Sequence, residues 1–314
     1  MSLGAKIQPV FILIAAIIGL ILGRFTNVGQ ISTGYIEFFL MLLLYILFLS
    51  VDVGQLKKAF GNIKYTGAAF GINFLVTPIL AFILGNVFFP ESIEIRIGLL
   101  MLLVTPCTDW YLVFTGLSKG NVALNLSILP MNLVAQILLM PVYLFIFLGS
   151  EVQMNILGML QSIVSVLLAP FIGAQITSKI IKNKAMTKDW ITQYGDNLQL
   201  LFLCLAVAVM FASESSSLFE NPILLLELFI PLILFFTIIL VIAQCVGRML
   251  HFDKPDIVAL NFTTLARNSP LSLAIAVVTF PDYPLTSLAL VIGPLIELPI
   301  LSLISSILAR WNRT

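Results

Sequence analysis

Long apolar stretches separated by short polar ones run along the whole chain. A helix that crosses a bilayer takes roughly 20 mostly apolar residues, and ten stretches approach or exceed that length. They cover 8–25, 34–53, 65–88, 94–118, 121–147, 153–179, 197–212, 222–248, 255–280 and 285–309. This pattern predicts an all-α integral membrane protein with ten transmembrane helices in the lipid bilayer.

The composition indicates the same class. Of the 314 residues, 60% are hydrophobic and 10% are charged, whereas soluble domains are roughly 25% charged. The formal net charge of +1 does not indicate a nucleic-acid partner. The three cysteines and the single histidine lack the spacing of a disulfide framework or a metal site. We therefore expect no metal and no cofactor.

The positions of the charged residues predict the orientation of the chain. If the N-terminus lies in the cytoplasm, thirteen of the sixteen Lys and Arg residues fall on the cytoplasmic side. Cytoplasmic loops of membrane proteins carry such an excess of Lys and Arg. We expect a multi-pass protein of the plasma membrane with both termini in the cytoplasm.

Two of the ten segments are interrupted by proline near the middle of the membrane. The fourth breaks at Pro106 and the ninth at Asn268-Ser269-Pro270. Proline removes a backbone donor and clashes with the preceding helical turn. Non-helical backbone at membrane depth is tolerated only where protein buries it or where it lines a polar cavity. Each break is therefore a candidate half of a transport site.

The two breaks lie at corresponding places in the two halves of the chain. Each half holds five segments, and the segment after the broken one contains a proline, Pro130 or Pro294. Because five is odd, the second half would be inverted relative to the first, as in many transporters. We expect one transporter domain over 1–314, with a first repeat at 1–150 and a second at 151–314. Chance similarity of the halves is the alternative.

The breaks also carry the candidate substrate-binding groups. Each following half-helix begins with unpaired N–H groups and partial positive charge, which attract anions and oxygen-rich solutes. Cys107 is a candidate soft ligand for a thiophilic solute; a packing role is the alternative. Further candidate substrate contacts are the polar residues at the two breaks, Thr108, Asp109, Asn268, Ser269 and Ser272.

Three ionisable residues lie deep in the predicted membrane. An isolated charge at the bilayer centre costs about 2.5–3.5 kcal/mol on insertion scales, so we expect Asp109 and Arg267 to face one another. The pair is either a structural bridge or a charge switch. Glu297 is either a coupling carboxylate or a helix-to-helix hydrogen-bonding group. Polar residues expected to line the same cavity are Asn73, Asn132, Gln136 and Thr263.

Several of these motifs resemble those of a known superfamily. Pro106-Cys107-Thr108, with Lys119-Gly120 beyond it, resembles the fourth helix of bacterial arsenite permeases, whose cysteine is required for transport. Residues 266–277 and 291–300 resemble their ninth and tenth helices. The chain is also similar to the related bile acid:sodium symporters. The resemblance implies two inverted five-helix repeats, a panel and a core domain, and crossed discontinuous helices four and nine.

The departures from these families bear on the coupling ion. Ser272 stands where arsenite permeases have a glutamate, and Thr263 and Arg267 stand where the symporters have sodium-binding residues. The resemblance therefore implies coupling to protons or to the substrate's own charge rather than to sodium. We expect Asp109 to take the place of the missing carboxylate, with Arg267 as its counter-charge.

These features together predict a secondary active transporter that works by alternating access. The expected substrate is a small arsenite-like oxyacid, exported from the cell. A small organic anion is the alternative, since Arg267 and two positive helix ends would suit it. A membrane sensor or an intramembrane enzyme is disfavoured, because the sequence shows no nucleophile-base pair with motif spacing and no signalling domain.

Overall fold

The structure is a computed structural model, and it describes most of the chain. The described residues are 3–26, 33–50, 62–107, 110–149, 169–178, 180, 197–198, 200–202, 204–209, 211–212, 215, 219 and 223–312.

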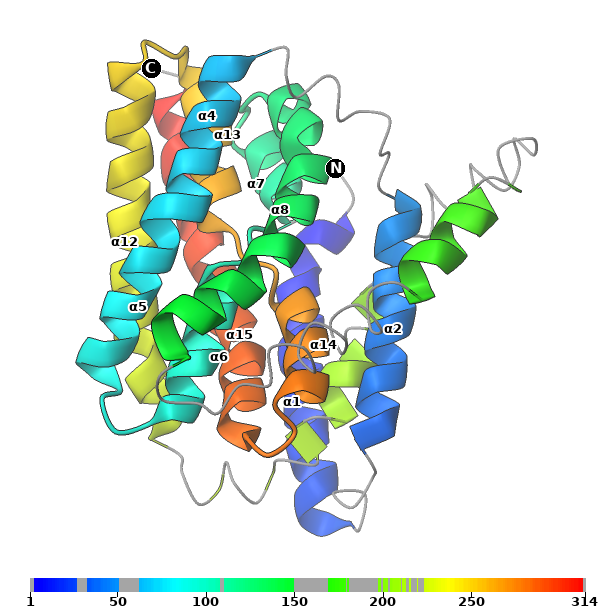
Figure 1. The fold of residues 1–314 in the computed structure, drawn as a ribbon. Helices are drawn as coiled ribbons and strands as arrows, with labels where there is room; N and C mark the ends of the chain where they lie inside the picture. Colours follow the sequence, from blue (N-terminus) through cyan, green and yellow to red (C-terminus); the bar gives the residue numbers. More distant parts are fainter. Residues whose placement is uncertain are drawn as a thin grey trace. The chain divides into compact units, whose positions relative to one another are not determined.

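Every long regular element among these residues is a helix (Figure 1). The named helices are α1 (Leu3–Phe25), α2 (Thr33–Ser50), α4 (Ile63–Gly71), η3 (Ile72–Val76), α5 (Thr77–Phe88), α6 (Ile93–Leu103), α7 (Trp110–Leu117), α8 (Val122–Leu148), α12 (Leu224–Met249), α13 (Lys254–Leu265), α14 (Ser269–Thr279) and α15 (Pro284–Trp311). The predicted all-α class is therefore confirmed for the described part of the chain.

The two predicted helix breaks are present. The fourth segment divides into α6 and α7, and the ninth divides into α13 and α14. Prolines elsewhere do not interrupt their helices, because α8 continues through Pro130 and Pro141. The sixth predicted segment, 153–179, and the seventh, 197–212, lie partly outside the described residues.

The chain divides into two compact units. The first comprises Met1–Asp52, Asn155–Leu224 and Pro270–Val291. In it, a β-carbon on Gly19 or Gly23 would collide with the main chain of Ala208 or Ala212. Glycine at this spacing lets two membrane helices approach closely.

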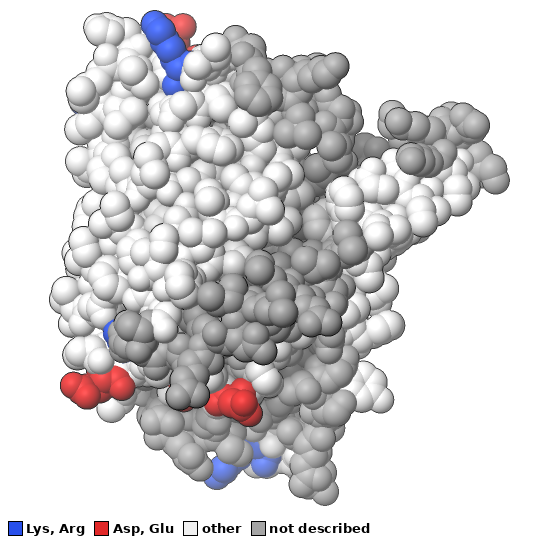
Figure 2. All heavy atoms as spheres, viewed as in Figure 1, with Lys and Arg blue, Asp and Glu red and all other residues white. Residues whose placement is uncertain are grey.

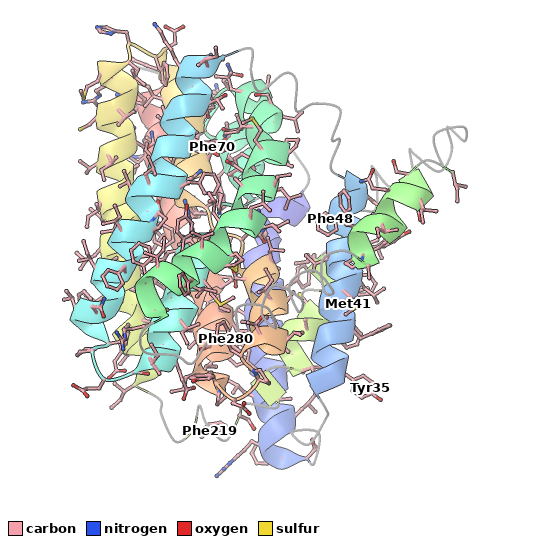
Figure 3. The ribbon with its side chains drawn as sticks, viewed as in Figure 1. Tyr35, Met41, Phe48, Phe70, Phe219 and Phe280 are labelled. Atoms are coloured by element: carbon pink, nitrogen blue, oxygen red, sulfur yellow. The ribbon has the colours of Figure 1, made fainter. Side chains whose placement is uncertain are left out.

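Aromatic residues of α2 extend the packing of the first unit. The Tyr45 hydroxyl donates to Thr177 Oγ1 over 2.8 Å. Phe48, which Figure 3 labels on α2, meets Phe171 edge to face with ring centroids 5.4 Å apart. These contacts join α2 to the helical residues around 171–177.

The second unit comprises Val53–Met154, Leu225–Ser269 and Ile292–Thr314. Within it, α13 contacts α4, α7 and α8, while α6 contacts α5 and α8. Residues 257–265 of α13 are all buried. The two helices that lead into the breaks, α6 and α13, therefore form the core of this unit.

A π-helical turn interrupts one long helix of the second unit. Residues 63–88 are helical throughout, but Ile72–Val76 form a π-helix between α4 and α5. Such turns are uncommon and often lie at functional sites. Asn73 lies in this turn and is fully buried.

Four described helices are long and apolar enough to span a membrane: Ile63–Phe88, Val122–Leu148, Leu226–Met249 and Pro284–Trp311. Exposed apolar residues recur every four positions along one face of the helix Ile63–Phe88, at Leu75, Ile79, Ile83 and Val87. The visible face of the second unit is uncharged over its middle and carries charged residues toward its two ends (Figure 2). An apolar belt of this kind suits lipid.

Candidate functional site

The two helix breaks meet through their main chains. The Cys107 N–H donates to the Ala266 carbonyl over 2.9 Å, and the Asn268 N–H donates to the Thr105 carbonyl over 2.7 Å. These bonds place Pro106 opposite Arg267 in a short antiparallel bridge. The bridge satisfies backbone groups that no helix can satisfy at this depth. We refer to residues 104–107 and 266–268 as the crossover.

The side chain of Arg267 is buried at the crossover and is 2% exposed. Its Nε donates to the Leu265 carbonyl over 3.0 Å, and its Nη1 donates to the Leu103 carbonyl over 2.7 Å. Its Nη2 donates to Asn73 Oδ1 over 3.1 Å and also to the Thr264 carbonyl. Four of the five N–H groups of the guanidinium are thus engaged by neutral oxygens.

These partners explain how a cation is tolerated there. Leu103 is the last residue of α6 and Leu265 is the last residue of α13. The final carbonyls of a helix lack partners within the helix and carry partial negative charge. The Phe235 ring, whose centroid lies 5.3 Å from Arg267 Cζ, adds a cation–π contact.

Glu297 also reaches the crossover, from α15. Its Oε1 accepts a hydrogen bond from the backbone N–H of Arg267 over 2.8 Å, and its side chain is 3% exposed. Asp109, the counter-charge expected from the sequence, lies outside the described residues, as does Thr108. The described partners of the guanidinium are carbonyl and amide oxygens, and one Nη1–H remains without a partner among the described residues.

Cys107 lies in the first break, three residues before the start of α7 at Trp110. Its Sγ accepts a hydrogen bond from the Trp110 N–H over 3.3 Å, and the side chain is 4% exposed. The thiol is therefore both at the crossover and held by the following half-helix.

The polar residues of the second break are also buried. Asn268 and Ser269 are 4% and 3% exposed, and Ser272 is fully buried one turn into α14. The Asn268 backbone belongs to the crossover bridge.

Three of the four expected cavity residues, Asn73, Asn132 and Thr263, are joined by hydrogen bonds. Asn73 Nδ2 donates to the Thr263 carbonyl over 3.1 Å, and Asn132 Nδ2 donates to Thr263 Oγ1 over 3.3 Å. Gln136, one turn beyond Asn132 on α8, is fully buried, and neither polar atom of its amide has a partner among the described residues. Asn132 Oδ1 and Thr77 Oγ1 also lack a hydrogen-bond partner among the described residues. Buried polar groups of this kind are places for water or a polar solute.

One buried polar cluster was not predicted from the sequence. Asn125 Oδ1 accepts from the Tyr65 hydroxyl over 2.6 Å, and Asn125 Nδ2 donates to Thr115 Oγ1 over 2.8 Å and to the Ala259 carbonyl over 3.0 Å. The Tyr111 hydroxyl donates to the Asn125 carbonyl over 2.9 Å. In the sequence, the signal for this cluster is the polar residue Asn125 within the apolar run 121–147. The cluster ties α4, α7, α8 and α13 together around the crossover helices.

Among the described residues, no group of three or more His, Cys, Asp or Glu is positioned to hold a metal ion. The site instead offers one thiol, one fixed guanidinium, one carboxylate and several amides.

The sequence of the chain is similar to those of several known proteins. A family model described as the Sodium Bile acid symporter family matches residues 37–221, more than half of the chain. The chain is 24% identical to the arsenical-resistance protein Acr3 of Corynebacterium glutamicum, over 94% of this chain and 86% of the relative. It is 23% identical to the arsenical-resistance protein Acr3 of Alkaliphilus metalliredigens, over 83% of this chain and 77% of the relative. It is 24% identical to the uncharacterized protein YbaS of Bacillus subtilis, over 97% of both chains.

Proposed function

Since the chain belongs to the sodium bile acid symporter family, we propose that it moves its substrate by alternating access as a secondary active transporter. Membership of this family makes the chain a membrane transporter for a small molecule and not an enzyme. The proposal adds a mechanism, in which the crossover is exposed in turn to the two sides of the membrane.

The proposed architecture has ten membrane-spanning helices. Two inverted five-helix repeats, 1–150 and 151–314, supply a panel and a core domain, and the fourth and ninth helices are the broken ones. Both termini lie in the cytoplasm and the protein resides in the plasma membrane. The broken helices α6–α7 and α13–α14 support this arrangement, because one lies within residues 1–150 and the other within residues 151–314.

The proposed substrate is an arsenite-like oxyacid, which the protein exports. The buried Cys107 thiol at the crossover carries this proposal, because trivalent arsenic is a soft centre that binds sulfur. Two relatives are named arsenical-resistance proteins. The hydroxyl groups of the solute would be bound by polar residues around the breaks, namely Thr108, Asp109, Asn268, Ser269 and Ser272.

The proposed coupling ion is the proton. Asp109 is two residues beyond Cys107 in the chain, and its carboxylate is the proposed partner of Arg267. Protonation of Asp109 in one state and pairing with Arg267 in the other would make coupling depend on the proton gradient. Glu297 would hold the backbone of Arg267 in place during this exchange.

Arsenite uptake into everted membrane vesicles tests the proposal. With an imposed proton gradient, we expect accumulation by the wild type, no accumulation above empty vesicles by Cys107→Ser, and wild-type accumulation by Cys245→Ser. Cys245 is an exposed cysteine on α12, so its variant controls for loss of a thiol as such. Asp109→Asn should abolish the dependence on the proton gradient. Equal accumulation by wild-type and empty vesicles would reject arsenite as the substrate.

A small organic anion is the second candidate substrate. The fixed charge of Arg267 and the amide ends of α7 and α14 favour it, because both attract a carboxylate. Uptake of an organic anion that survives Cys107→Ser would support this alternative.

A further inference from the structure

Four oxygens converge on the guanidinium of Arg267 from three parts of the second unit. Three are main-chain carbonyl oxygens at the ends of α6 and α13, and the fourth is an amide oxygen from the π-helical turn η3. We call them the crossover oxygens: Leu103 O, Thr264 O, Leu265 O and Asn73 Oδ1.

The crossover oxygens are positioned independently of the arginine side chain. Asn73 is oriented by its own Nδ2, which donates to the Thr263 carbonyl. The carbonyls of Leu103 and of residues 264 and 265 are fixed by their helices, which the crossover bridge joins. Removing the guanidinium would therefore leave the oxygens in place, buried and without their donor.

The electrostatics of this place favour a cation. Two helix C-termini each contribute partial negative charge, and all four ligands are neutral oxygens, the type that hard monovalent cations accept. The Phe235 ring faces the same position. A site built in this way attracts a positive charge. In this protein the guanidinium of Arg267 supplies that charge.

We propose that the crossover oxygens form a monovalent-cation site that Arg267 fills permanently. The wild-type protein then takes up no external cation there. A variant without the guanidinium exposes the site to small cations, and free guanidinium, which presents the same donors, fits it best. This inference concerns cation binding and does not depend on which solute is transported.

Thermal unfolding of purified Arg267→Ala in detergent tests the proposal. Guanidinium chloride at low millimolar concentration should raise its Tm by about 2–4 °C over choline chloride at equal ionic strength. Sodium or potassium chloride should give a smaller rise. The wild type and Arg248→Ala, which removes an exposed arginine of α12, should show the same Tm in all four salts.

Two further variants keep the proposal open to rejection. If Arg267→Ala cannot be purified, guanidinium present from solubilisation onward should restore its monodisperse yield, and failure to do so overturns the proposal. Adding Asn73→Leu to Arg267→Ala removes one crossover oxygen and should abolish the guanidinium response. An Arg267→Ala Tm that is identical in guanidinium and choline, or a wild type that responds equally, also overturns it.

Discussion

Glu297 and Arg267 are joined through the main chain and not through the guanidinium. The carboxylate accepts the backbone N–H of Arg267 over 2.8 Å, while the side chain of Arg267 turns to the carbonyls of Leu103 and Leu265. The Glu297 carboxylate therefore holds the backbone of the second break, and the Arg267 guanidinium joins the ends of two helices. A buried N–H without an acceptor would be costly at this depth.

This hydrogen bond predicts different losses of stability for two substitutions at Glu297. Glu297→Gln keeps an oxygen acceptor for the Arg267 N–H, whereas Glu297→Leu removes it. We expect the leucine variant to lose about 1–3 kcal/mol of stability and the glutamine variant to lose less. Thermal unfolding of the two purified variants measures the difference. Equal losses would show that the charge of Glu297 matters and that its hydrogen bond does not.

The Asn125 cluster predicts a coupled loss of stability. Asn125→Leu leaves the Tyr65 hydroxyl and the Ala259 carbonyl without this partner, and should cost about 3 kcal/mol. Tyr65→Phe removes one donor and should cost about 1 kcal/mol. Because the two residues share one hydrogen bond, the double variant should lose less than the sum of the single losses. Strict additivity in a double-mutant cycle of thermal unfolding would contradict the cluster.

Two glycines on different helices should respond oppositely to alanine. A β-carbon on Gly293 of α15 would lie 2.6 Å from Leu102 Cδ2, in the buried contact with α6, whereas one on Gly67 of α4 would meet nothing within 4 Å. Gly293→Ala should destabilise the protein by about 1–3 kcal/mol through overpacking. Gly67→Ala should stabilise it by about 0.5–1 kcal/mol through helix propensity. A stable Gly293→Ala protein would show that α6 and α15 are not packed this closely.

Much of the framework follows from the sequence because its causes are local. A proline among polar residues within an apolar run predicts the breaks at Pro106 and before Pro270, whereas Pro130 and Pro141 leave α8 continuous. Apolar length predicts the spanning helices. The same local reasoning gives the burial of polar groups such as Asn132, since a bilayer leaves them no other environment than the protein interior.

The partners within the site could not be predicted in this way. The guanidinium of Arg267 binds main-chain carbonyls, and a carbonyl is present at every residue, so no residue type marks it. The bridge between Cys107 and Ala266 likewise joins backbone groups 159 positions apart in the numbering, and the π-helical turn at Asn73 has no sequence signature. The sequence therefore predicts which residues are deep, while the tertiary structure determines what they contact.

The protection of Cys107 from alkylation tests most directly whether the crossover thiol holds the solute. In a Cys204→Ser, Cys245→Ser background, Cys107 is the single remaining thiol of the chain. We expect arsenite to slow its alkylation by N-ethylmaleimide several-fold in membranes, and phosphate at the same concentration to leave the rate unchanged. An alkylation rate that is the same with and without arsenite would contradict the proposed site.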